Sequence, residues 1–151
     1  MPDQIVLLGA FLVAPFAFFA SWVAVLYAIS VLGGWRDLSF SYATTITPPV
    51  PLMRFRHGRL GTMAAYNASL TLGSSPQGLY LSVFAILRPC HPPLLIPWSD
   101  VDLHLQPGRF REYIVFRFAK HPRSTLRLPR ALGEELLKMG GSPLPARVVN
   151  G

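Results

Sequence analysis

A long uncharged segment near the start of the chain constrains the fold more than any other feature. From Ile5 to Trp35 no side chain is charged, and most residues are aliphatic, aromatic or alanine. A helix of about 20 apolar residues crosses a hydrocarbon core of about 30 Å, so the part from Ile5 to Gly33 is long enough to span a bilayer. We therefore expect residues 1–35 to form a transmembrane anchor.

Two other interpretations of this segment fit less well. A secretory signal peptide has a positively charged start, an apolar stretch of roughly 7–15 residues and a small-residue cleavage site. Here Asp3 is the only charge before Ile5, the apolar run is longer, and the best cleavage match is the weak Ala28-Ile29-Ser30. Two crossings would need roughly 40 residues. We expect one helix, which Pro15 can kink.

Basic residues set the expected orientation. The chain has 14 Lys and Arg against 7 Asp and Glu, a net charge of +7, and every Lys and Arg follows the apolar segment. Lys and Arg near the end of a span are retained on the cytoplasmic side, and Trp and Tyr settle in the headgroup belt. We expect an inner-membrane protein with a short N-terminus outside, a cytoplasmic domain, and Trp35 and Tyr42 at the membrane surface.

Three arginines close to the anchor form the candidate lipid or partner contact: Arg54, Arg56 and Arg59. Anionic lipid attracts such juxtamembrane cations by about 1 kcal/mol each. Alternation along a strand places Arg54 and Arg56 on one face and Phe55 on the other. No recognition helix or stacking motif accompanies the cations, so no nucleic-acid partner is expected.

The rest of the chain has the pattern of a small β-rich domain. Residues 36–51 are expected to be a semi-rigid linker, because Pro48-Pro49-Val50-Pro51 favours extended backbone. Short apolar runs separated by turn residues then predict strands over residues 52–59, 63–72, 78–87, 94–98, 101–105, 112–119 and 125–128. Residues 142–151 are expected to be a loose tail.

The strongest alternation places Ile114, Phe116 and Phe118 on one strand face, toward the core, with Leu126 and Leu128 pointing inward on the next strand. A helix is predicted from Arg130 to Met139. Its apolar stripe consists of Leu132, Leu136, Leu137 and Met139, and Gly140-Gly141 ends it. About 100 residues suffice for one domain with a single core.

Two motifs carry a resemblance that covers residues 52–141. Gly78-Leu79-Tyr80-Leu81-Ser82 and the later Ile96-Pro97-Trp98-Ser99-Asp100 resemble a strand pair and turn of small bacterial single-pass membrane proteins of unassigned function. The chain also resembles, more loosely, bacterial pleckstrin-homology-like domains. The resemblance implies a half-open β-barrel capped by a C-terminal helix, and some relatives bind phosphoinositides or peptides. The sequence has no dense Lys/Arg loop between its first two strands beyond Arg54, Arg56, His57 and Arg59.

The Pro97-Trp98-Ser99-Asp100 turn is expected to be structural. Pro97 ends a strand, Trp98 covers one end of the core, and Ser99 and Asp100 accept hydrogen bonds from backbone N–H groups. Ser99, Asp100 and His104 are residue types of a hydrolase triad, but strand alternation sends Ser99 and Asp100 to opposite faces. We expect no catalytic residues.

No cofactor or metal is expected either. The single cysteine, Cys90, excludes an intrachain disulfide, and the Cys90-His91 pair lacks the spaced partners of a metal site.

These observations favour a membrane-anchored cytoplasmic interaction module that binds a protein partner or anionic lipid headgroups. The first alternative is an accessory subunit that acts through its helix, either with another membrane protein or as a homo-oligomer. Small residues at helical spacing would allow the close approach of another helix. They are Ala17, Ala20, Ser21, Ala24 and Ala28. The second alternative, an enzyme, has the least support.

The orientation can be tested with reporters fused after Gly151. A reporter that works only in the cytoplasm should be active, because Arg36 and the arginines after it are retained there. A reporter that is active only in the periplasm should be silent, and activity there would contradict the prediction. A mature protein that begins near Val31 in mass spectrometry would instead support the signal-peptide interpretation.

Overall fold

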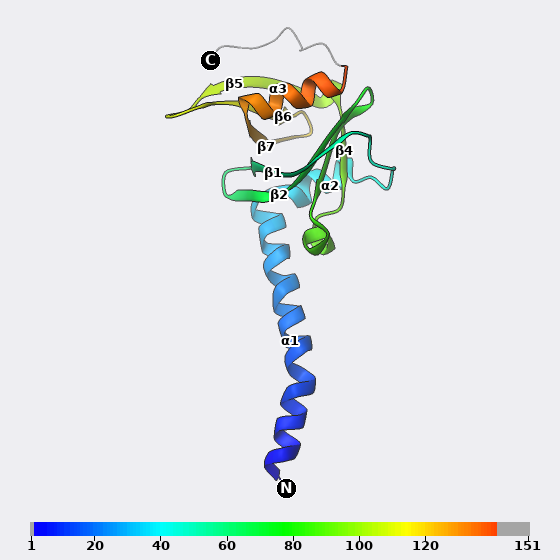
Figure 1. Cartoon of the computed structure of the whole chain (residues 1–151), viewed down its shortest axis with the longest axis vertical. Coiled ribbons are helices and arrows are strands. Elements are labelled where there is room, and N and C mark those ends of the chain that lie inside the picture. Colours follow the sequence, from blue (N-terminus) through cyan, green and yellow to red (C-terminus); the bar gives the residue numbers. More distant parts are fainter. Residues whose placement is uncertain (1, 142–151) are drawn as a thin grey trace.

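One long helix forms the predicted anchor. The computed structural model describes residues 2–141 and is shown in Figure 1. Helix α1 runs from Pro2 to Leu32 without interruption, with Pro15 inside it. Among the described residues it is the one helix long and apolar enough to cross a membrane, with a mean hydropathy of 2.2 from Asp3 to Leu32. All side chains from residue 3 to 21 are exposed, as lipid-facing side chains are.

A second helix, α2 (Trp35–Tyr42), replaces the first half of the predicted linker. Trp35, Leu38 and Tyr42 are buried and recur at the spacing of one helix face. The prediction of an extended spacer is therefore wrong for this segment. Trp35 and Tyr42 also lie in the core of the domain and not in a headgroup belt. The burial of these three side chains offsets the poor intrinsic stability of so short a helix.

Two glycines connect the helices. Gly34 has a positive φ of 79°, which favours glycine. A Cβ added at Gly33 would lie 2.5 Å from the Cβ of Ala64, so only glycine lets the chain pass this close to strand β2 (Ala64–Ser75). The direct turn from α1 into α2 therefore depends on both residues.

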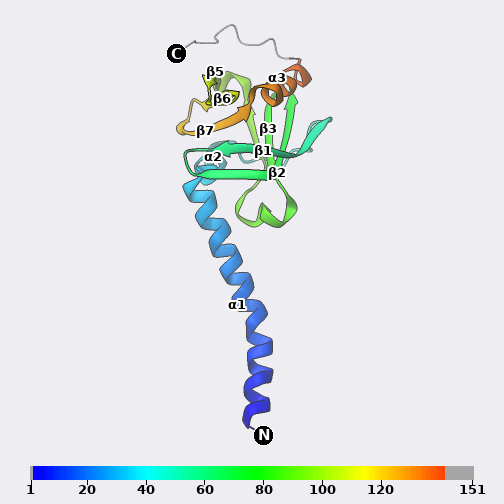
Figure 2. The ribbon, with the colours of Figure 1, turned by 60° about the vertical axis from the view of Figure 1, so that its left-hand side comes forward.

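Seven antiparallel strands form one curled sheet, a half-barrel with the order β4-β3-β2-β1-β7-β6-β5. The strands are β1 (Leu52–Leu60), β2 (Ala64–Ser75), β3 (Gly78–Val83), β4 (Leu94–Pro97), β5 (Val101–Pro107), β6 (Glu112–Phe118) and β7 (His121–Pro129). Short helical turns, η1 (Ala85–Cys90) and η2 (Trp98–Asp100), flank β4, and α3 (Arg130–Met139) follows β7. Figures 1 and 2 both place α2 at the end of the sheet near α1 and α3 at the far end.

Most predicted elements agree with the structure. The helix predicted from Arg130 to Met139 has the observed bounds, and all seven strands are present. The largest differences are at the third strand, which ends at Val83 and gives way to η1, and at the seventh, which begins earlier, at His121. The predicted tail, 142–151, lies outside the described residues.

The core confirms the predicted faces. Ile114, Phe116 and Phe118 are buried in one cluster with Leu126 and Leu128. From α3, Leu136 and Leu137 are buried, while Leu132 and Met139 pack against the cluster. Helix α3 thus closes the far end of the half-barrel with the apolar stripe expected of it.

The buried side chain of His91 contacts both α2 and the sheet. The ring of His91 lies 5.3 Å from that of Trp35, centroid to centroid. Its Nδ1 lies 3.0 Å from the carbonyl oxygen of Leu87, which can only accept, so Nδ1 carries the proton. Nε2 therefore accepts from the hydroxyl of Tyr66, also at 3.0 Å. Burial lowers the pKa of His91 and outweighs the opposite effect of the Leu87 hydrogen bond.

Replacing Phe116, which is fully buried, tests the core. Phe116→Ala should lower the free energy of unfolding by about 3–5 kcal/mol, because it removes a ring and leaves a cavity. Denaturant unfolding of the full chain in detergent measures this. Phe110→Ala is the matched control, since Phe110 is 90% exposed and should change stability by less than about 0.5 kcal/mol. Equal effects of the two substitutions would contradict the assigned strand face.

The buried His91 predicts a loss of stability in acid. The folded state disfavours the protonated ring, so the unfolded chain binds more protons, and stability falls as the pH drops through the ordinary histidine pKa of about 6.5. The thermal midpoint of the full chain should therefore fall between neutral and mildly acidic pH. His91→Gln should reduce this pH dependence, whereas His57→Gln, at an exposed position, should retain it. An unchanged dependence in His91→Gln would refute the assignment.

Candidate functional site

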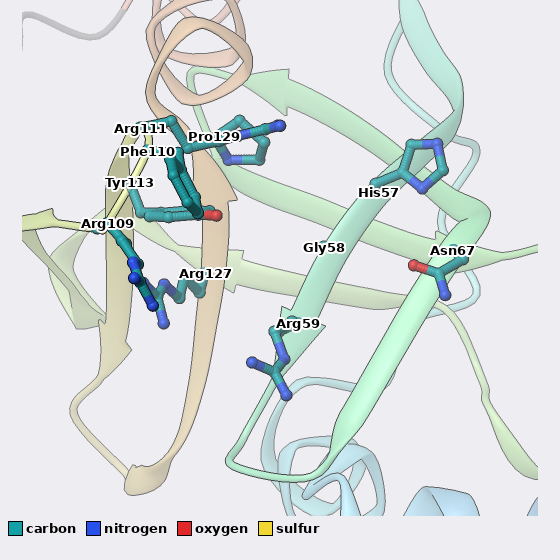
Figure 3. Close-up of a pocket in the computed structure, with 11 residues that line it drawn as sticks. His57, Gly58, Arg59, Asn67, Arg109, Phe110, Arg111, Tyr113, Arg127 and Pro129 are labelled. Carbon is teal, nitrogen blue, oxygen red and sulfur yellow. The ribbon is translucent and has the colours of Figure 1, made fainter.

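The junction of β1 with β7 opens into a cleft. In the described part of the chain, these strands pair only through Arg59 with Arg127 and Leu60 with Leu126. Toward Pro129 the strands diverge and leave an open cleft of about 430 Å³. Figure 3 shows its lining, which we call the arginine cleft: His57, Gly58, Arg59, Asn67, Gly108, Arg109, Phe110, Arg111, Tyr113, Arg127 and Pro129.

Two of its arginines are paired across the junction of β1 and β7. Arg59 and Arg127 are register partners in the antiparallel pair, an arrangement in which like charges destabilise the sheet. The guanidinium carbon of Arg127 lies 4.0 Å from the centroid of the Tyr113 ring, which holds it in place. Its Nε is buried and has no hydrogen-bond partner among the described residues. The cleft therefore contains concentrated positive charge and an unsatisfied donor.

The hairpin between β5 and β6 supplies the other two arginines. Gly108 N–H donates to the carbonyl of Arg111 at 3.0 Å and closes this turn. Between them, Arg109 lies near the ring of Phe110, which is 90% exposed. The cations and an aromatic surface thus lie side by side at the cleft margin.

Two carboxylates outside the cleft lining are already paired with another arginine. Glu112 and Glu134 both form salt bridges with Arg130, outside the cleft lining. Within residues 2–141, none of the four cleft arginines forms a salt bridge. An anion from outside the chain would therefore not compete with an internal partner.

The three arginines of the predicted lipid or partner contact do not line one common cleft. All three are exposed on β1, but register shifts lie on either side of Arg56, and Phe55 has a φ of +55°. Simple alternation therefore fails here: Phe55 is 59% exposed and does not point away from its neighbours into the core. Arg59 lines the arginine cleft, whereas Arg54 lines a different cleft of about 230 Å³.

The Pro97–Asp100 turn has a structural role, with partners other than those predicted. Pro97 ends β4, and the indole N–H of Trp98 donates to the carbonyl of Ser75 at 2.7 Å. The carboxylate of Asp100 accepts from the hydroxyl of Tyr42 at 3.0 Å and lies 3.6 Å from Nζ of Lys120. Within the described part of the chain, no backbone N–H donates to it. Ser99 is exposed. Among the described residues, no hydrogen bond joins Ser99 to Asp100 or His104.

The small residues of α1 lie on the helix face that the domain leaves uncovered. Ala17, Ala20, Ser21, Ala24 and Ala28 are all exposed. Leu26 and Ser30, on the opposite face, are buried against the domain. The ridge is therefore open to lipid or to another helix.

Three cleft arginines were not identified from the sequence. Arg109 and Arg111 come from the β5–β6 turn and Arg127 from β7, all far from Arg59 in sequence, and only the curled sheet brings them to it. The local signal was the turn Pro107-Gly108 followed by Arg-Phe-Arg, which exposes two cations and a ring. The described residues include no group of three or more His, Cys, Asp or Glu side chains that could hold a metal ion.

Comparison of the chain with protein-family models, with curated proteins and with solved structures gives no match.

Proposed function

We propose that the protein is a membrane-anchored interaction module whose arginine cleft binds a carboxylate- or phosphate-bearing segment of a protein partner. In this proposal α1 spans the inner membrane and the domain faces the cytoplasm. The observation that carries the proposal is the cross-strand pair Arg59 and Arg127, with its buried unsatisfied Nε and no carboxylate partner in the described chain.

The chemistry of the cleft favours an anion with two acceptor oxygens. Guanidinium groups present a planar fork of donors that matches carboxylate and phosphate geometry. An anion between Arg59 and Arg127 would reduce the repulsion between their guanidinium groups. The adjoining rings of Phe110 and Tyr113 suit a segment that alternates acidic and apolar side chains.

Arg59 and Arg127 lie near the end of α1, since Gly61 packs against Gly33, but the hairpin side of the cleft favours a protein over the protein's own bilayer. Figures 1 and 2 both place the β5–β6 hairpin, which carries Arg109 and Arg111, toward the α3 end of the domain. Helix α1 leaves from the opposite end. A headgroup of the membrane that α1 crosses would have to reach past the sheet to contact these arginines.

We assign the domain to the pleckstrin-homology-like class as part of this proposal. The support is the strand order, with a four-stranded meander from β1 to β4, a three-stranded one from β5 to β7, and a C-terminal helix over one end. This is the architecture that the sequence resemblance implies, and peptides are among the ligands of such domains.

An accessory subunit acting through α1 remains the second candidate. The observation in its favour is the uncovered ridge from Ala17 to Ala28. Partners that bind there would survive deletion of the domain from Leu52 to Gly141 in a crosslinking pull-down. Partners of the arginine cleft would be lost.

The cleft is tested with a short fluorescent peptide that alternates Glu and Phe, added to the full chain in phosphatidylcholine nanodiscs. The peptide should bind, and Arg59→Gln or Arg127→Gln should each weaken binding about tenfold or more, since a hydrogen bond to a charged group contributes about 1.5–3 kcal/mol. Arg54→Gln is the matched control, with the same charge change on the same strand, and should bind normally.

Two outcomes would overturn the assignment. Equal weakening by Arg54→Gln and Arg59→Gln would mean that net charge, and not the cleft, attracts the peptide. Absence of peptide binding together with Arg59-dependent binding to phosphatidylglycerol vesicles would replace the protein partner with an anionic lipid.

A further inference from the structure

The segment between β3 and β4 extends along the anchor helix. Turn η1 packs against α1, and the thiol of Cys90 lies 3.7 Å from the carbonyl oxygen of Val23. In Figures 1 and 2 this turn is the part of the domain that descends farthest beside α1. The segment exposes large apolar side chains, with Phe84 49% and Ile86 58% exposed.

An apolar groove of about 440 Å³ lies between this turn and the helix. Its lining contains no charged residue and consists of Phe18, Phe19, Trp22, Ala85, Ile86 and Pro89. The groove continues the exposed apolar surface of residues 3–21 of α1. It therefore opens onto the part of the chain that would face lipid.

The length of the uncharged segment determines where the groove lies relative to the bilayer. A span needs about 20 residues, and the uncharged part of the chain runs from Gln4 to Trp35. Every 20-residue window within that part includes residues 16–23. Wherever the bilayer lies along α1, the turn beside Phe18 and Val23 is at the level of the hydrocarbon or at its margin.

The backbone of this turn has internal hydrogen bonds that suit the edge of the hydrocarbon layer. Leu87 N–H donates to the carbonyl of Phe84 at 2.9 Å, and His91 N–H donates to that of Arg88 at 3.0 Å. Internal hydrogen bonds of this kind are required of backbone that meets lipid. Arg88 lines the neighbouring cleft on the domain side, together with Arg54, where a phosphate could meet them.

We propose that the Phe84–Cys90 segment is a second membrane contact: it enters the leaflet beside α1, and an acyl chain of a surrounding phospholipid fills the groove. The lipid phosphate faces Arg88. This inference rests on the proposal that α1 spans a bilayer, and it does not depend on the arginine cleft. The domain then contacts the membrane through both α1 and this segment, which together fix its orientation relative to the bilayer.

The test places one environment-sensitive fluorophore at a time on the full chain in phosphatidylcholine nanodiscs. Cys90 is the only native cysteine, so a Cys90→Ala background allows single labels through Ile86→Cys, Phe11→Cys and Gln77→Cys. Phe11 lies in the exposed part of α1, and Gln77 is exposed in the β2–β3 turn. Quenching is measured with aqueous iodide and with phospholipids spin-labelled along the acyl chain.

The label at residue 86 should show blue-shifted emission, quenching by lipids spin-labelled near the carbonyl end of the chain, and loss of iodide quenching. The label at residue 11 should respond to deeper spin labels, and that at residue 77 to iodide alone. If the label at residue 86 responds to iodide as the label at residue 77 does, while the label at residue 11 is in lipid, this inference is wrong. The proposal that α1 spans the bilayer would then still stand. Iodide quenching at residues 11 and 86 alike would overturn both.

Discussion

The burial of Trp35 is the interaction on which the rest of the structure depends. Its side chain is fully buried, its indole N–H donates to the carbonyl of Pro92 at 3.0 Å, and its ring meets those of Tyr66 and His91. Because Trp35 begins α2 directly after the glycine turn, the anchor helix has no flexible spacer between it and the core. The core of the domain is thus attached directly to α1, the candidate membrane span.

This attachment gives the two ends of the half-barrel different roles. At one end α2 packs against β4 and β7, and the carboxylate of Asp100 accepts a hydrogen bond from Tyr42 across this contact. At the other end α3 covers the core, and the hairpin with Arg109 and Phe110 extends beside it.

The sequence predicted the elements whose signals are local. Alternation at Ile114, Phe116 and Phe118, and the apolar stripe of the last helix, are periodic patterns that the core then uses directly. Helix α2 was missed because its aromatic residues also fit a headgroup belt, and only the fold decides which apolar environment surrounds them. The exposure of Phe55 between Arg54 and Arg56 was not predicted, because the irregular register around Phe55 has no signal in the residue pattern. The arginine cleft is a product of sheet curvature, which joins segments 50 to 70 residues apart in sequence.

The short ladder between β1 and β7 divides the half-barrel into two leaves, β1–β4 and β5–β7. Helix α3 bridges the leaves, since it contacts β2 on one and β6 and β7 on the other. Arg59 belongs to the first leaf and Arg109 to the second. An anion bound by Arg59 and Arg109 together would connect the two leaves across the β1–β7 junction. Binding of this anion would then stabilise the pairing of β1 with β7. The bound anion would therefore oppose local opening of the sheet at this short ladder.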